Sequence, residues 1–110
     1  MLIETKQNKE TKENIISALE EAIGVPREYW EIKRSKETTE LEIRQIYCFL
    51  LRTNTDFTTQ YIADIIGYKH HSSVLRTTEA IEEALITNEK VKRIVNEFKK
   101  EYEQGYPNTI

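Results

Sequence analysis

The stretch GYKHHSSVLRT, residues 67–77, decides how the rest of this 110-residue chain is interpreted. It begins with a glycine, continues through four polar or basic residues and two serines, and then reaches the apolar pair Val74–Leu75. This order is typical of a tight turn followed by a helix whose first turn faces outward. The second helix of a helix-turn-helix begins in this way, with its N-terminal residues placed to reach DNA. The pattern alone leaves an ordinary helical hairpin with a solvated turn as an equal alternative.

Apolar residues at helical spacing predict further helices on both sides of this stretch. We expect helices over about residues 11–23, 40–52, 58–66, 71–86 and 88–104, with a short helical turn at Pro26–Trp30. In the helix over about 40–52, Arg44, Gln45 and Arg52 are expected to fall away from the apolar stripe, which consists of Ile43, Ile46, Tyr47, Leu50 and Leu51. In the helix beginning near His71, the expected inner face consists of Val74, Leu75, Thr78, Ile81 and Leu85. The order of short helix, glycine turn and longer helix predicts a helix-turn-helix at about 58–86.

The fold class expected from this pattern is all-α, a compact domain of five to six helices. We expect residues 1–10 to be a flexible lead-in, 11–104 to form the domain and 105–110 to be a tail. Three glycines and two prolines are few interruptions, which favours helices over a many-stranded sheet. Gly24 is expected to cap the first helix and Asn88 the last. The single cysteine, Cys48, cannot form an internal disulfide and is interpreted as a buried thiol, and the single tryptophan, Trp30, as a core anchor.

Charge is unevenly distributed along the chain. The net charge is −3, which argues against a nucleic-acid partner. Residues 43–78, however, carry four basic and two acidic side chains, a local balance of +2, whereas residues 1–42 carry seven basic and ten acidic. The positive part contains the stretch 67–77. No apolar run reaches membrane-spanning length and the N-terminus lacks a signal-peptide pattern, so we expect a soluble cytoplasmic protein.

Catalytic and metal chemistry find little support in the sequence. There is no phosphate-cradling glycine-rich loop, no Gly-x-Ser-x-Gly, and no convincing acid–base pair. His70 and His71 are adjacent, so their side chains diverge, and no Cys or carboxylate cluster supplies further ligands at zinc-like spacing. We therefore expect a protein that is not an enzyme, with no cofactor, no metal and no small-molecule substrate.

Residues 43–85 resemble the C-terminal DNA-binding domain of the bacterial replication initiator DnaA, and the resemblance extends over about residues 14–100. The family signature Gly-Gly-Arg-Asp-His-Thr-Thr-Val-Leu-His-Ala falls on residues 67–77. Arg44–Gln45 falls on the family's Arg-Gln, and Arg52 on a phosphate-contacting lysine. The resemblance implies a helical domain with a helix-turn-helix of the Trp-repressor-like type.

The resemblance also implies roles for individual residues. Arg44 corresponds to an arginine inserted into the minor groove and Arg52 to a backbone contact, and residues 71–73 correspond to those that read the groove and bind phosphate. His70 replaces the family's aspartate, so we expect a different base sequence to be read. The expected DNA-binding residues are Arg44, Arg52, Lys69, His70, His71, Ser72, Ser73 and Arg76.

Two functions follow from this pattern. The first is a stand-alone, non-catalytic protein that binds double-stranded DNA by sequence, related to the recognition or regulation of replication origins. The second is a protein-interaction module that kept the fold and has weak or lost DNA binding. The net charge of −3, the glutamates of the connector KRSKETTELEIR at 33–44 and the missing aspartate favour the second.

Overall fold

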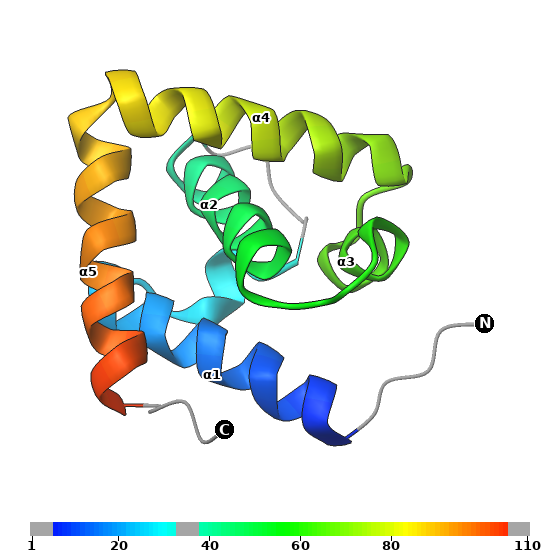
Figure 1. Ribbon diagram of the computed structural model, residues 1–110, viewed down its shortest axis with the longest axis horizontal. Helices are drawn as coiled ribbons and strands as arrows, with labels where there is room; N and C mark the ends of the chain where they lie inside the picture. The colour runs from blue at the N-terminus through cyan, green and yellow to red at the C-terminus, as the bar shows by residue number, and fades with distance from the viewer. Residues whose placement is uncertain (1–5, 33–37, 106–110) are drawn as a thin grey trace.

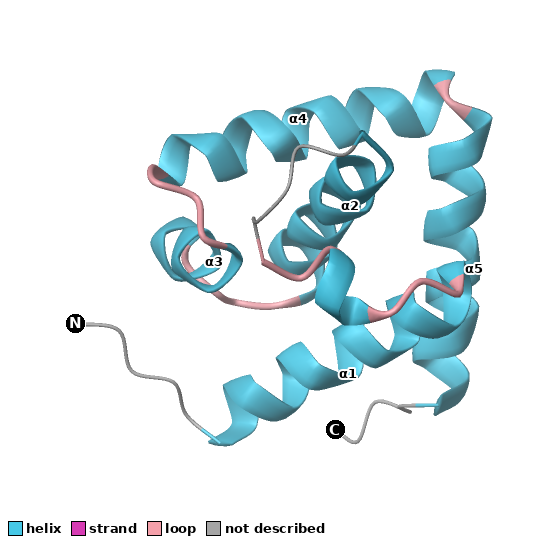
Figure 2. Ribbon diagram, turned by 180° about the vertical axis from the view of Figure 1, so that it is seen from behind, coloured by secondary structure: helices cyan, strands magenta, loops and turns pink. Residues whose placement is uncertain are grey.

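The computed structural model describes residues 6–32 and 38–105, in which every regular element is a helix (Figure 2). The elements are α1 (Lys6–Ile23), the 3₁₀ turn η1 (Arg27–Tyr29), α2 (Thr38–Asn54), α3 (Thr59–Ile66), α4 (His71–Thr87) and α5 (Glu89–Gly105). The predicted all-α fold is confirmed. None of the described helices is both long and apolar enough to cross a membrane.

Helix α2 lies in the middle of the molecule, with α1, α3, α4 and α5 arranged around it (Figure 1). Its central position follows from its composition, because residues 46–51 (IYCFLL) are apolar on every side of the helix. All six of these side chains are buried. Helices α1 and α5 pack against each other on one side, and α3 packs against the first part of α4 on the other (Figure 1).

The helix ends differ from the predicted ones mainly in α1 and α2. Helix α1 begins at Lys6, five residues before the predicted start at 11, because Lys, Gln and Glu propagate a helix well without a buried face. Helix α2 runs from Thr38 to Asn54, two residues longer at each end than the predicted 40–52. Pro26 precedes the 3₁₀ turn as its cap and is not its first residue. The predicted domain limits stay a prediction, and connector residues 33–37 lie outside the described residues.

The predicted helix caps are confirmed. Gly24 adopts φ +69° and its N–H donates to the Glu20 carbonyl at 2.8 Å, which ends α1. Asn88 begins α5, where its side-chain oxygen accepts from the backbone N–H groups of Lys90 at 3.0 Å and Val91 at 3.3 Å.

Trp30 is the predicted core anchor and is fully buried. Its indole N–H donates to the Val25 carbonyl at 2.9 Å, so the ring carries no unpaired polar group into the core. The ring also meets Tyr47 of α2 edge to face, with 5.3 Å between centroids. Trp30 thereby attaches the η1 segment to the central helix.

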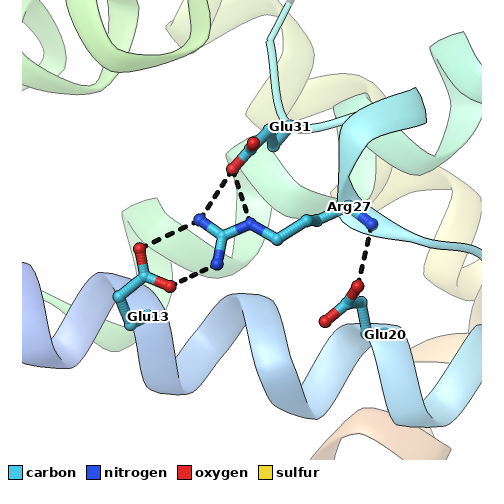
Figure 3. Close-up of polar contacts among 4 residues, drawn as sticks. All are labelled: Glu13, Glu20, Arg27 and Glu31. Atoms are coloured by element: carbon cyan, nitrogen blue, oxygen red, sulfur yellow. Dashed lines mark hydrogen bonds and ion pairs between the residues drawn. The ribbon is translucent and has the colours of Figure 1, made fainter.

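Arg27 fixes the same segment to α1 (Figure 3). Its guanidinium binds both carboxylate oxygens of Glu13, one through Nη1 and one through Nη2, the latter at 2.9 Å. Nε also donates to Glu31 at 2.9 Å, and Nη2 forms an ion pair with the same carboxylate oxygen at 2.8 Å. The backbone N–H of Arg27 donates to Glu20 at 2.9 Å. The hydrogen bond from Arg27 holds the pKa of Glu13 below its usual value.

Replacing Arg27 with alanine is expected to lower the free energy of unfolding by about 1–2 kcal/mol at pH 7, because the carboxylates of Glu13 and Glu31 lose a shared, half-buried partner. A carboxyl whose folded pKa is lowered adds stability above its ordinary pKa and loses it as the pH falls through the folded pKa. The difference in the free energy of unfolding between the natural protein and the variant should therefore be largest above pH 4.5 and shrink below it. Urea unfolding across pH 3 to 7 measures this; a difference independent of pH would contradict the assignment.

The Cys48 thiol is buried, as predicted, and burial raises its pKa to about 12. The thiolate fraction at pH 8 is then about a thousand-fold below that of an exposed cysteine. We expect no reaction with a thiol reagent such as DTNB in native buffer at pH 8, and complete reaction after unfolding in urea. Rapid modification of the folded protein would show that α2 is not covered as described.

Candidate nucleic-acid interface

A tight turn at Gly67 joins α3 to α4. Gly67 adopts φ +95°, in the left-handed region, and the N–H groups of Gly67 and Tyr68 both donate to the Ala63 carbonyl, at 2.9 and 2.8 Å. A residue with a Cβ would be strained at this φ, which explains why glycine occupies the position. The predicted end of the short helix at Gly67 is confirmed, and the chain enters α4 at His71.

Tyr68 attaches the turn to the rest of the domain. Its ring is half-buried and packs against the hydrophobic core, and its hydroxyl lies near Thr77, in the second turn of α4. Burial raises the pKa of Tyr68, and the neighbouring Thr77 side chain opposes this in part. Sequence reasoning placed Tyr68 among the polar turn residues and missed this role. The available signal was an aromatic residue beside a turn glycine, which usually packs onto a neighbouring helix.

The start of α4 is polar and exposed. The side chains of Lys69, His70, His71 and Arg76 are exposed, and those of Ser72 and Ser73 are half-buried. All six belong to the turn or to the first two turns of one helix, so they share one end of α4. The structure therefore places these six predicted residues together, while their contact with DNA stays a prediction.

The first turn of α4 has no side-chain cap. Its N-cap residue, His70, makes no capping hydrogen bond, whereas the Thr58 hydroxyl caps α3 by accepting from Tyr61 N–H at 3.1 Å. The N–H of Ser73 donates to the His70 carbonyl at 3.1 Å. Exposed first-turn N–H groups carry a partial positive charge and suit a phosphate oxygen. The missing cap was not predicted from the sequence. It could have been, because a histidine occupies a position where Ser, Thr, Asp or Asn is usual.

Arg52 lies in the last turn of α2, and its side chain is exposed, away from the apolar residues that precede it. This agrees with its predicted outward position. Arg52 therefore adds a cation from a second helix to the exposed polar residues of the candidate interface.

Arg44 does not face outward, and the prediction that it falls away from the apolar face of its helix is wrong. Its side chain is 1% exposed, and its Nε and Nη2 atoms are buried without a hydrogen-bond partner among the described residues. Its charge lies near Tyr68, where it opposes the rise in the pKa of that hydroxyl. In this conformation the guanidinium cannot reach a DNA groove.

The position of α2 explains the error. Sequence reasoning assumed one apolar stripe with polar residues on the far side, as for a surface helix. Because α2 is enclosed by the other helices, positions on both sides of the stripe are covered (Figure 1). Cys48 and Phe49, which lie outside the predicted stripe, are buried together with Arg44.

Leu75 is also placed differently from the prediction. It was expected on the inner face of α4, and it is 39% exposed, whereas Val74 and Ile81 are buried. Successive residues of a helix point about 100° apart, so Leu75 lies at the edge of the face centred on Val74. The inner face of α4 is therefore narrower than predicted.

Metal binding has no support at this interface. Among the residues that the structure describes, no group of three or more His, Cys, Asp or Glu side chains could hold a metal ion. His70 and His71 lie at the exposed start of α4, where their side chains face solvent.

Comparison with known proteins agrees with the resemblance to DnaA. The chain is 29% identical over 85 residues to the chromosomal replication initiator protein DnaA of Picosynechococcus sp., a match that covers 76% of this chain and 18% of that protein. No protein-family model matches the chain, and no solved structure matches it significantly. The chain thus spans about a fifth of the curated relative it matches. We conclude that the chain is a helical domain related in sequence to part of DnaA.

Proposed function

We propose that this chain is a non-catalytic, cytoplasmic protein that binds double-stranded DNA through a helix-turn-helix formed by α3, the Gly67 turn and α4. The single observation that carries the proposal is the exposed, basic and uncapped start of α4 behind that turn. A helix that presents free N–H groups and small polar side chains at its N-terminus is suited to enter the major groove.

The residues divide by chemistry. Lys69, Arg76 and Arg52 supply cations for phosphate oxygens, which provide affinity but little sequence information. His70, His71 and residues 72–73 supply donors and acceptors at the helix start, where base edges come within reach. Arg44 is not included in this set, because its side chain is buried.

Position 70 determines how the bases are read. A carboxylate accepts a hydrogen bond from the cytosine amine, whereas imidazole donates through one nitrogen and accepts through the other. We propose that His70 gives this chain a recognition sequence different from that implied by the DnaA signature. The name of the relative, chromosomal replication initiator, supports a role in origin recognition or its regulation.

Selection of bound sequences from a random duplex pool at low salt tests the proposal. We expect enrichment of a common motif by the natural protein and a changed motif with His70→Asp, which restores the carboxylate of the signature. A pool that stays random, with no retention of any duplex, would contradict DNA binding. Retention without enrichment would limit the function to non-specific binding.

The alternative function is a protein-interaction module that retains the fold. The net charge of −3 and the buried Arg44 favour it, since both reduce the positive charge available to phosphates. This alternative predicts no duplex retention in the selection even at low salt.

A further inference from the structure

An apolar groove lies between the end of α1, the start of α2 and the start of α5. Its volume is about 270 Å³. The aliphatic residues that line it are Ala22, Ile23, Val25, Ile43 and Ile94. This volume is below the roughly 300–1,000 Å³ of pockets for drug-sized ligands. The groove therefore has room for one or two aliphatic side chains and is too small for a nucleotide cofactor.

Charged side chains form the rim of the groove, and the basic ones outnumber the acidic. Lys90 Nζ lies 3.0 Å from a Glu42 carboxylate oxygen, so these two charges neutralise each other across the groove. Arg93 is exposed and has no salt-bridge partner among the described residues. The acidic residues one turn away from it on α5, Glu89 and Glu97, are paired with Lys92 and Lys100.

The unpaired positive charge of Arg93 indicates which chemical groups a ligand of the groove would carry. An aliphatic side chain can displace water from the apolar floor, and a carboxylate beside it can pair with the guanidinium at the rim. A basic partner would instead be repelled by the unpaired charge of Arg93.

The groove is remote from the candidate DNA-binding residues. Helix α5 and the end of α1 lie at the left of Figure 1, whereas α3 and the start of α4 lie at the right. A segment held in the groove would leave the start of α4 uncovered. Docking there does not depend on the proposed DNA binding, and the two can occur together.

We propose that this groove, lined by α1, α2 and α5, is a docking site for a partner protein, which inserts an aliphatic side chain next to a carboxylate. The partner segment is acidic and amphipathic, in the manner of a short peptide or helix seated in a groove. Arg93 selects the carboxylate, and Ile94 contacts the aliphatic group.

Titration of the ¹⁵N-labelled protein with N-acetyl-leucine, observed by NMR, tests the proposal with the smallest probe that carries both groups. We expect saturable shifts in the millimolar range at the amides of residues 22–25, 43 and 94. The uncharged analogue N-acetyl-leucinamide should bind about two- to five-fold more weakly, as expected for one exposed ion pair.

Two variants distinguish an effect of the Arg93 charge from a general effect of removing a charge from α5. Arg93→Gln should make the acid and the amide bind equally, whereas Lys99→Gln, which removes an exposed charge of α5 outside the groove, should leave the preference unchanged. Absence of saturable shifts, shifts elsewhere on the protein, or equal binding of acid and amide to the natural protein would overturn the proposal. None of these outcomes bears on duplex binding, which is measured separately.

Discussion

Replacing Arg44 with methionine is expected to raise the free energy of unfolding by about 1–4 kcal/mol. Arg44 is 1% exposed, and two nitrogen atoms of its guanidinium have no hydrogen-bond partner among the described residues. Folding therefore removes a charge from water without forming hydrogen bonds at these atoms to offset the lost hydration. Methionine has a similar length, is flexible enough to fill the same space and carries no charge. Urea unfolding monitored by circular dichroism measures the difference.

Two further variants make this result specific. Arg44→Ala removes the charge but leaves a cavity, which typically costs about 2–5 kcal/mol for a large side chain, so it should be less stable than the methionine variant. Arg52→Met makes the same change at an exposed position of α2 and should alter stability by less than about 0.5 kcal/mol. If Arg44→Met lowered the free energy of unfolding by about 3 kcal/mol or more, Arg44 would be part of a buried ion pair.

The stabilised variant also decides whether Arg44 acts in DNA binding. The proposed interface leaves Arg44 out, so Arg44→Met should bind a duplex as the natural protein does. A loss of affinity in a more stable protein would show that Arg44 leaves the interior when DNA binds. The stability lost by burying an unpaired charge would then serve function, as in proteins that trade stability for activity.

The second large effect is expected from Lys69→Ala combined with Arg76→Ala. If both cations contact phosphate, the slope of log K against log salt should become less negative by about 1.8, which is twice the 0.9 expected for each contact. Binding at low salt should weaken at least about ten-fold. Both side chains are exposed, so the free energy of unfolding should change by less than about 0.5 kcal/mol. Fluorescence anisotropy over a range of salt concentrations measures the slope.

Lys92→Ala with Lys100→Ala is the matched control, because it removes the same charge from α5, where each lysine is paired with a glutamate three residues earlier. A uniform effect of net charge would change both double variants equally. Such a result would mean that the start of α4 is not the site of phosphate contact.

Much of the fold could be predicted because the local signals agree with the tertiary structure. Gly24, Gly67 and Asn88 ended or began helices as expected, since each position needs a left-handed φ or a side-chain acceptor that few other residues provide. The amphipathic pattern of α3 and the exposed start of α4 were likewise apparent from residue spacing.

What could not be predicted depends on contacts between distant segments. The burial of Arg44 depends on how the other helices cover its side of α2, and a periodic pattern shows only one face. The Arg27 cluster joins residues up to fourteen positions apart, and Tyr68 of the turn packs against a core that other helices form. The apolar groove is made by three helices, so no single stretch of sequence indicates it.

NMR titration of the ¹⁵N-labelled protein with a duplex from the selection shows whether double-stranded DNA binds at the start of α4. We expect the largest amide shifts on residues 69–76, including the uncapped first-turn N–H groups of His71 and Ser72. We expect little change along α1 and α5. Shifts centred on the groove of α1, α2 and α5, or no shifts at low salt, would contradict DNA binding at the start of α4.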